Sequence, residues 1–156
     1  MIELGKPIQD ISITKESSLE KIFEQMSKSG GFESRNLADG LDVLTVMIKD
    51  NDCLKFLSFV GAIISTGLRG IIKDMIKNKW FNTVITTCGA LDHDIARHFS
   101  NYNEGSFTLD DVTLAEKNIH RLGNVLVPMD SYGPLIEEKM QSFLEEEYNK
   151  GTREMS

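Results

Sequence analysis

Two glycine-bearing turns carry the side chains of this sequence that are best suited to binding chemistry. The first turn spans residues 61–67 (GAIISTG). Its Gly61 lets a ligand approach the backbone closely, and Ser65 and Thr66 offer hydroxyl groups. The second turn, residues 86–94 (TTCGALDHD), adds a thiol, a histidine and two carboxylates. Backbone N–H groups at such turns bind phosphate and other anions. The first turn matches neither glycine-rich phosphate motif, so taken alone it is better interpreted as a purely structural turn.

The elements around the two turns decide whether these groups meet. The predicted strands are 54–60, 82–87 and 124–127, and the predicted helices are 17–29, 35–50, 68–76, 91–99, 110–117 and 134–148. A helix connects the first two strands, which predicts a right-handed parallel crossover. Both turns then lie beyond the carboxyl ends of neighbouring strands and frame one crevice. We expect an α/β fold with three parallel strands.

An acid–histidine–acid triplet, Asp92-His93-Asp94, ends the second turn. Asp94 and His98 are four positions apart and share a helix face, which is one arrangement of metal ligands. However, His93 and His98 are five apart and face different ways, and no third ligand lies nearby in the sequence. We therefore predict no metal site. Asp92 is predicted to cap the following helix, where it is also placed to meet the ammonium group of a ligand.

Length and composition narrow the class of protein. With 156 residues, of which 40% are hydrophobic, the chain is long enough for one domain with its own core. Acidic residues outnumber basic ones by 24 to 17, which argues against a nucleic-acid surface. No apolar stretch suits a signal peptide or a membrane span. Cys53 and Cys88 are expected to be buried free thiols in a reducing cytoplasm, although a helix start would also activate Cys88 as a nucleophile.

Several stretches of the sequence occur together in the order and spacing of one known family. They are GGF at 30–32 with Asn36-Leu37, CLKFLSFVGAIISTGLR at 53–69, TTCGALDHD at 86–94 and NIHRLGNVLVP at 118–128. Together they resemble deoxyhypusine synthase, and the ordered set is far more specific than any single motif. The resemblance implies a Rossmann-like α/β fold, a parallel sheet with flanking helices. It also implies NAD-dependent transfer of the aminobutyl group of spermidine to one lysine of the hypusine-containing translation initiation factor, by a homotetramer with active sites between subunits.

The resemblance also implies which residues bind. Cofactor contacts fall on Gly61, Ala62, Ile63, Ile64, Ser65, Thr87, Cys88, Gly89 and His93. Spermidine contacts fall on Asp92 and His93. Many family members have Ser-Asn where this chain has Gly61-Ala62, Ala in place of Cys88, and an acid in place of His93. These departures leave NAD as the expected cofactor and bear mainly on the specificity for the polyamine.

The family's imine-forming lysine lies downstream of every residue present here, so we assign no catalytic residue to this chain. We expect an incomplete domain, with an amino-terminal arm at 1–16, the amino-terminal part of a deoxyhypusine-synthase-like domain at 17–150, and a polar tail at 151–156. Such a chain is a fragment, a truncated gene product or one piece of a split enzyme, and it needs a carboxyl-terminal half for activity. The alternatives are a non-catalytic subunit that pairs with a full-length synthase, or a polyamine transferase similar to homospermidine synthase.

Overall fold

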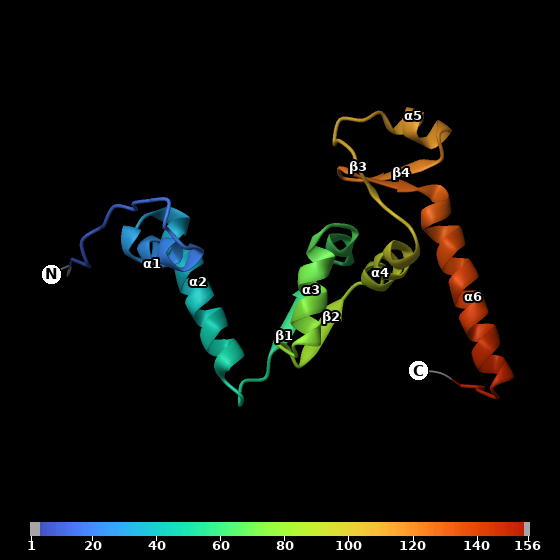
Figure 1. Cartoon of the computed structure of the whole chain (residues 1–156), viewed down its shortest axis with the longest axis horizontal. Helices are drawn as coiled ribbons and strands as arrows, with labels where there is room; N and C mark the ends of the chain where they lie inside the picture. Colours follow the sequence, from blue (N-terminus) through green and yellow to red (C-terminus); the bar gives the residue numbers. More distant parts are fainter. Residues whose placement is uncertain (1–3, 155–156) are drawn as a thin grey trace. The chain divides into compact units, whose positions relative to one another are not determined.

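The computed structural model describes residues 4–154, and the chain divides after Lys55 into two units (Figure 1). The first unit holds α1 (Leu19–Ser29) and α2 (Phe32–Lys49). The second unit holds β1 (Phe56–Phe59), η1 (Gly61–Ser65), α3 (Leu68–Lys77), β2 (Thr83–Thr86), α4 (Gly89–Phe99), β3 (Asn103–Glu104), α5 (Asp111–Glu116), β4 (Ile119–Leu122), β5 (Val125–Pro128), η2 (Met129–Ser131) and α6 (Gly133–Asn149). The first three residues of the predicted arm and the last two of the predicted tail lie outside the described residues. The boundaries of arm, domain and tail stay predictions.

The first unit is a pair of helices joined by a tight turn at Gly30. Ser18 caps α1, and its hydroxyl accepts the N–H of Lys21 at 3.3 Å. Gly30 ends α1 with a φ of +68°, a left-handed conformation that glycine adopts without a steric penalty. The arm before α1 passes the end of that helix, where the N–H of Gln9 donates to the carbonyl of Lys28 at 3.1 Å. Both helices predicted for this region are present.

The second unit begins with the parallel crossover that the sequence predicts. β1 and β2 pair in parallel from Phe56 opposite Thr83 to Phe59 opposite Thr86, with η1 and α3 between them in the chain. α3 and α4 lie over the face that carries Phe59 and Val84, and these four elements enclose an open hollow of about 420 Å³. The fold class is confirmed as mixed α/β, with a small parallel sheet and flanking helices.

The expected third parallel strand is wrong. The run at 124–127 does form a strand, β5, but β5 pairs antiparallel with β4 and β3 in a separate sheet of order β3-β5-β4. The physical reason lies in the two residues between β4 and β5, Gly123 and Asn124, because Gly123 has a φ of +63°. A two-residue loop with a glycine at positive φ turns the chain back on itself as a β-hairpin. The parallel sheet therefore has two strands.

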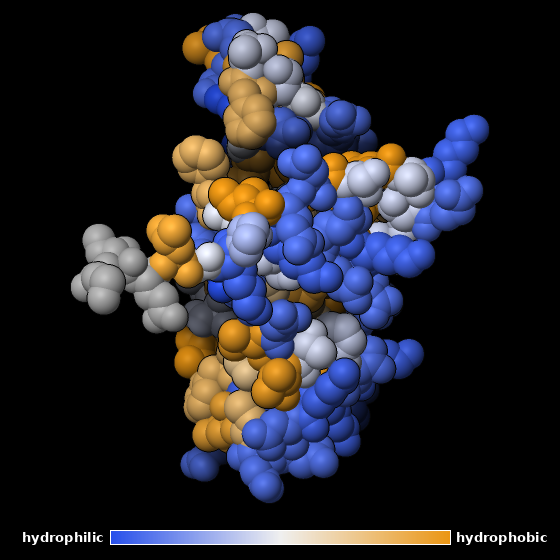
Figure 2. All heavy atoms as spheres, turned by 90° about the vertical axis from the view of Figure 1, so that its left-hand side faces the viewer, coloured by the Kyte–Doolittle hydropathy of each residue, from blue (hydrophilic) through white to orange (hydrophobic). Residues whose placement is uncertain are grey.

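Little apolar surface is buried within this chain. The buried apolar side chains among the described residues are Ala38, Ile64, Ala90, Ala96, Leu114 and Val127, and no large one is fully buried. Figure 2 shows apolar side chains as orange patches at the surface. The chain exposes 12,333 Å². One globule of 17.5 kDa exposes about 7,900 Å², and two globules of the sizes of the two units about 9,400 Å². The chain therefore exposes more surface than compact globules of these sizes do.

The uncovered surface includes one face of the parallel sheet. Phe56, Val60 and Ile85 alternate with the residues under α3 and α4, so they lie on the opposite face. Their exposed fractions are 53%, 65% and 55%. Parallel sheets occur almost only where both faces are covered. Within the described residues, the second face of this sheet is largely exposed.

Candidate functional site

The two glycine-bearing turns lie against each other, as the strand order predicts. The N–H of Gly61, at the start of η1, donates to the Oγ1 of Thr87, which follows β2, at 2.9 Å. A Cβ at Gly61 would lie 2.7 Å from that oxygen, 2.8 Å from the carbonyl carbon of Gly89, and closer still to the nitrogen of Ala90. The glycine at position 61 is therefore required by the packing of η1 against the start of α4. Its assignment to a cofactor stays a prediction.

The predicted cofactor residues divide by exposure. Ala62, Thr87 and Cys88 are exposed, Ile63, Gly89 and His93 are half-buried, and Gly61, Ile64 and Ser65 are buried. The hydroxyls expected to face a ligand are already hydrogen-bonded within the turn. Ser65 donates to the carbonyl of Ala62 at 2.7 Å, and Thr66 donates to that of Ile63 at 2.7 Å. The surface that the paired turns offer to a ligand is thus the exposed edge of Ala62, Thr87 and Cys88.

Cys88 corrects two expectations. Its side chain is exposed, and Cys53 is half-buried, so neither is the fully buried thiol that the sequence suggested. Cys88 is also the residue that precedes α4, which begins at Gly89. Asp92 therefore lies in the first turn of the helix and is not its N-cap. The cause is that the glycine and alanine after the thiol already adopt helical geometry, so the helix begins earlier than the acidic residue indicates.

Asp92 and Asp94 have different partners. Asp92 accepts a hydrogen bond from the hydroxyl of Tyr132 at 3.2 Å, and it is half-buried. Asp94 is more exposed and forms an ion pair with Arg69 of α3, with Nε and Oδ1 2.6 Å apart. A carboxylate has about four lone-pair sites, so Asp92 keeps capacity for a cationic ligand. Asp94 serves to tie α4 to α3.

His93 lies between two tyrosines that the sequence analysis did not identify. Its Nδ1 is 3.0 Å from the hydroxyl of Tyr102, and its ring centroid is 5.3 Å from that of Tyr132. Burial lowers the pKa of His93 by more than the Asp92 carboxylate raises it, and the Arg97 guanidinium lowers it further. The imidazole is therefore neutral at pH 7. A neutral ring here offers a ligand an apolar and hydrogen-bonding surface without a positive charge.

The two tyrosines are held as neutral phenols. Burial, followed by the neighbouring Tyr132, raises the pKa of Tyr102 to about 12. Burial and then the Asp92 carboxylate raise the pKa of Tyr132. His93 and Tyr132 line an open hollow of about 440 Å³ whose opposite wall comes from β4 and β5. No sequence signal pointed to this arrangement, since Tyr132 lies 40 positions from Asp92.

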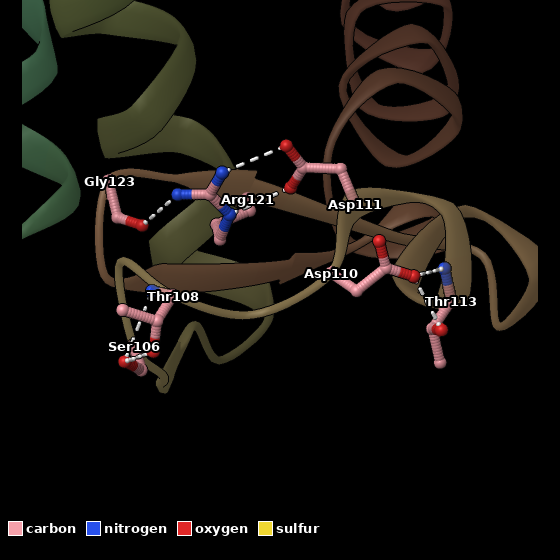
Figure 3. A network of polar contacts seen from close by, with 7 residues as sticks. All are labelled: Ser106, Thr108, Asp110, Asp111, Thr113, Arg121 and Gly123. Atoms are coloured by element: carbon pink, nitrogen blue, oxygen red, sulfur yellow. Dashed lines mark hydrogen bonds and ion pairs between the residues drawn. The ribbon is translucent and has the colours of Figure 1, made fainter.

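The antiparallel sheet is fixed by its own polar network, which Figure 3 shows. Arg121 of β4 donates to both carboxylate oxygens of Asp111, at 2.7 and 2.8 Å, and to the carbonyl of Gly123 at 2.9 Å. Asp110 caps α5 by accepting the N–H of Thr113 at 2.8 Å. Hydrogen bonds from Arg121 lower the pKa of Asp111. These contacts position the hairpin wall of the hollow and leave Arg121 engaged within the fold.

Two further features bear on the class of site. Within residues 4–154, no three histidine, cysteine or acidic side chains come together in a way that would hold a metal ion. In the same part of the chain, no helix combines the length and the apolar character that a bilayer span requires.

The chain matches known proteins over nearly its whole length. The family model described as deoxyhypusine synthase matches residues 21–156. A relative named "Probable deoxyhypusine synthase" from Thermoplasma volcanium is 49% identical over 146 residues, which are 94% of this chain and 47% of that protein. Relatives of the same name from Thermoplasma acidophilum and Picrophilus torridus are 46% and 43% identical over 147 residues, with the same coverage. The chain thus spans about half the length of the curated relatives it matches.

Proposed function

The chain belongs to the deoxyhypusine synthase family, and on that premise we propose that it is the amino-terminal portion of a deoxyhypusine synthase. The proposed reaction is NAD-dependent transfer of the aminobutyl group of spermidine to a lysine of the hypusine-containing translation initiation factor. The observation that carries the proposal is the direct contact between the two turns through Gly61 and Thr87. This contact brings the residues that the resemblance assigns to the cofactor to one edge of the parallel sheet.

The residues of the paired turns fit one part of a dinucleotide. Ala62, Thr87 and Cys88 are exposed beside the N-terminal end of α4, where the positive end of the helix dipole favours a phosphate. The buried residues of the turn would not touch the cofactor and would instead fix the backbone of the turn; they are Gly61, Ile64 and Ser65. NAD would supply the hydride acceptor, and this chain would supply part of its cradle.

Asp92 and His93 are the proposed contacts to the polyamine. The Asp92 carboxylate is a partner for an ammonium group, and Tyr132 holds it in place. The neutral ring of His93, flanked by Tyr102 and Tyr132, suits the apolar methylene chain between two ammonium groups. We assign the imine-forming lysine to another part of the protein, since no lysine of this chain matches the family's position.

The uncovered apolar surface supports a further half. One face of the two-stranded sheet carries Phe56, Val60 and Ile85 in the open, and both strands have free edges. We propose that a carboxyl-terminal half extends this sheet and covers its second face, and that the assembled protein is a homo-oligomer in the cytoplasm. Exposed apolar faces of sheets commonly mark contacts with further protein.

A second candidate function is a non-catalytic subunit that binds an intact synthase. The neutral His93, at a position where the family pattern has an acid, favours this alternative because it removes a charge that would attract spermidine. Co-purification with an intact synthase distinguishes the two. A regulatory subunit changes the rate of a synthase that is already active, whereas an enzyme half is required for any activity.

Reconstitution tests the proposed function directly. The full chain is mixed with the carboxyl-terminal half of the Thermoplasma volcanium relative, NAD, labelled spermidine and the acceptor factor, and label on the factor is counted. We expect transfer that needs both halves. Asp92→Asn keeps an acceptor for Tyr132 but loses the charge. The spermidine concentration that gives half-maximal transfer should therefore rise by roughly tenfold or more. Asp39→Asn is the control and should leave transfer unchanged, because Asp39 lies in α2 of the first unit and only forms an exposed ion pair with Arg35. A folded complex without transfer refutes the proposal.

A further inference from the structure

We propose that Arg97 of α4 is a positioning residue that fixes the far end of η1, so that the two turns keep the separation that one dinucleotide requires. This inference rests on the proposed function, because it concerns the same pair of turns. Arg97 does not lie at their exposed edge. It would act through the backbone of η1.

The Arg97 guanidinium caps the end of η1. Its Nη1 donates to the carbonyl of Ile64 at 2.7 Å and to that of Thr66 at 2.5 Å. The last carbonyls of a helix lack partners within the helix, and Ile64 is only 5% exposed. A cation placed at this end satisfies the Ile64 carbonyl, shares the Thr66 carbonyl with the backbone N–H of Arg69 at 3.2 Å, and opposes the negative end of the helix dipole. Within the described residues Arg97 forms no ion pair with a carboxylate, so these carbonyls are its polar partners.

The ring of Tyr102 supports the guanidinium. The central carbon of that group lies 6.0 Å from the ring centroid, and the hydroxyl of Tyr102 contacts Nδ1 of His93. Arg97 and His93 are four positions apart and therefore lie on the same side of α4. Tyr102 thus connects the residue that holds the turn to a residue proposed to meet the substrate. The arginine is packed and half-buried, which limits its alternative conformations.

η1 is consequently tied to the second turn and its helix at both ends. At its start, the N–H of Gly61 donates to Thr87, and at its end, the guanidinium of Arg97 donates to the Ile64 carbonyl. A turn held at two points presents a fixed edge, and a fixed edge loses less conformational entropy when a ligand binds. The distance between Ala62 and Cys88 then depends on Arg97 although neither residue touches it.

The chain offers a matched control in Arg69. Its side chain also joins α4, through Asp94 at 2.6 Å, but it runs from α3 and contacts no carbonyl of η1. Arg97→Met removes the donors and keeps an unbranched stem. Arg97→Lys keeps the charge and a donor. Arg69→Met removes an arginine of the same unit without touching the turn.

Hydrogen exchange of the full chain tests the role of Arg97 without any ligand. We expect amide exchange over residues 61–66 to be roughly tenfold faster in Arg97→Met, intermediate in Arg97→Lys, and unchanged in Arg69→Met. Exchange in β1 and β2 should stay as in the wild type. Equal exchange of the turn in Arg97→Met and the wild type would overturn the inference. If Arg97→Met fails to fold, the measurement is made on Arg97→Lys. Amide exchange over residues 61–66 that equals that of the wild type in this variant would also overturn the inference.

NAD titration of the complex with a carboxyl-terminal half tests the consequence. We expect Arg97→Met to bind NAD roughly tenfold more weakly, Arg97→Lys to recover part of the loss, and Arg69→Met to bind as the wild type does. Equal losses in the two methionine variants would show general destabilisation and overturn the positioning role. A wild-type complex that binds no NAD would refute the proposed function, while the exchange experiment still decides whether Arg97 holds the turn.

Discussion

Replacing Gly61 with alanine tests the contact between the two turns most sharply. The added methyl group would occupy space that the Thr87 hydroxyl and the backbone of residues 89 and 90 already fill. Two of the three atoms nearest to this methyl group belong to the backbone, so a movement of the Thr87 side chain alone would not relieve the clash. η1 would have to separate from the start of α4, and the hydrogen bond from Gly61 to Thr87 would lengthen with it.

The size of the effect follows from three contributions. Overpacking of a filled site costs about 1–3 kcal/mol. Weakening the hydrogen bond costs about 1 kcal/mol more. Alanine restricts the unfolded chain and so returns about 0.4–1 kcal/mol. The free energy of unfolding should therefore fall by about 1–3.5 kcal/mol. Gly70→Ala is the control, because Gly70 lies within α3 with nothing within 4 Å of its missing Cβ, and alanine there should stabilise by about 0.5–1 kcal/mol.

Urea unfolding of the full chain, followed by tryptophan fluorescence, measures both variants. Trp80 is the single tryptophan and lies in the second unit, so its signal reports the unit that contains both turns. We expect the two substitutions to shift the urea midpoint in opposite directions. A Gly61→Ala midpoint equal to or above that of the wild type would refute the packing of η1 against α4.

Three further predictions use the same assay. Thr87→Val removes the acceptor for the buried N–H of Gly61 and should cost about 1–2 kcal/mol, whereas Thr87→Ser should recover most of it; equal stability of the two variants would contradict the contact. Burial lowers the pKa of His93 in the folded state, so the unfolded chain binds the proton at a higher pH than the folded chain does. The contribution of the neutral His93 to the free energy of unfolding should therefore be complete above about pH 6.5 and should decrease as the pH falls towards the folded-state pKa. His93→Gln should remove this pH dependence between about pH 7.5 and 5.5. Arg121 lowers the folded-state pKa of Asp111, so the pair should stabilise above about pH 3.9 and lose its effect as the pH falls through the lower folded pKa; Asp111→Asn should reduce this acid sensitivity, and an unchanged profile would count against the pair.

The parallel crossover and the meeting of the two turns could be predicted from the sequence. Short apolar runs ending in glycine, separated by a helical stretch, leave a right-handed crossover as the economical arrangement. That arrangement places the turns at 61–67 and 86–94 at one edge of the sheet. The structure adds why residue 61 is a glycine: a Cβ there would clash with Thr87 and with the backbone of residues 89 and 90, so the packing of the fold requires it.

The hairpin was missed although its signal was present. Gly123-Asn124 lies between Leu122 and the apolar run that starts at Val125, and it is a two-residue turn of the kind that favours a hairpin. The strand–helix–strand pattern of residues 54–87 instead predicted that the run at 124–127 joins the parallel sheet, which is wrong. The direction in which a four-residue strand pairs depends on the turn before it as much as on its own side chains.

The partners of the candidate site could not be predicted. Tyr102 and Tyr132 lie in segments without a helical or strand pattern that would aim them at Asp92 and His93, and only the folded chain brings them together. The same holds for Arg97, whose partners are backbone carbonyls. Every residue carries the same backbone carbonyl, so the identity of a residue does not indicate which carbonyl a side chain contacts.

Calorimetric titration of NAD into the full chain assembled with a carboxyl-terminal half is the measurement that bears most directly on the central claim. Saturable binding that Gly61→Ala weakens and Gly70→Ala leaves unchanged is the result that the paired turns predict. A folded, assembled complex that takes up no NAD, or one whose affinity is indifferent to Gly61→Ala, would contradict it.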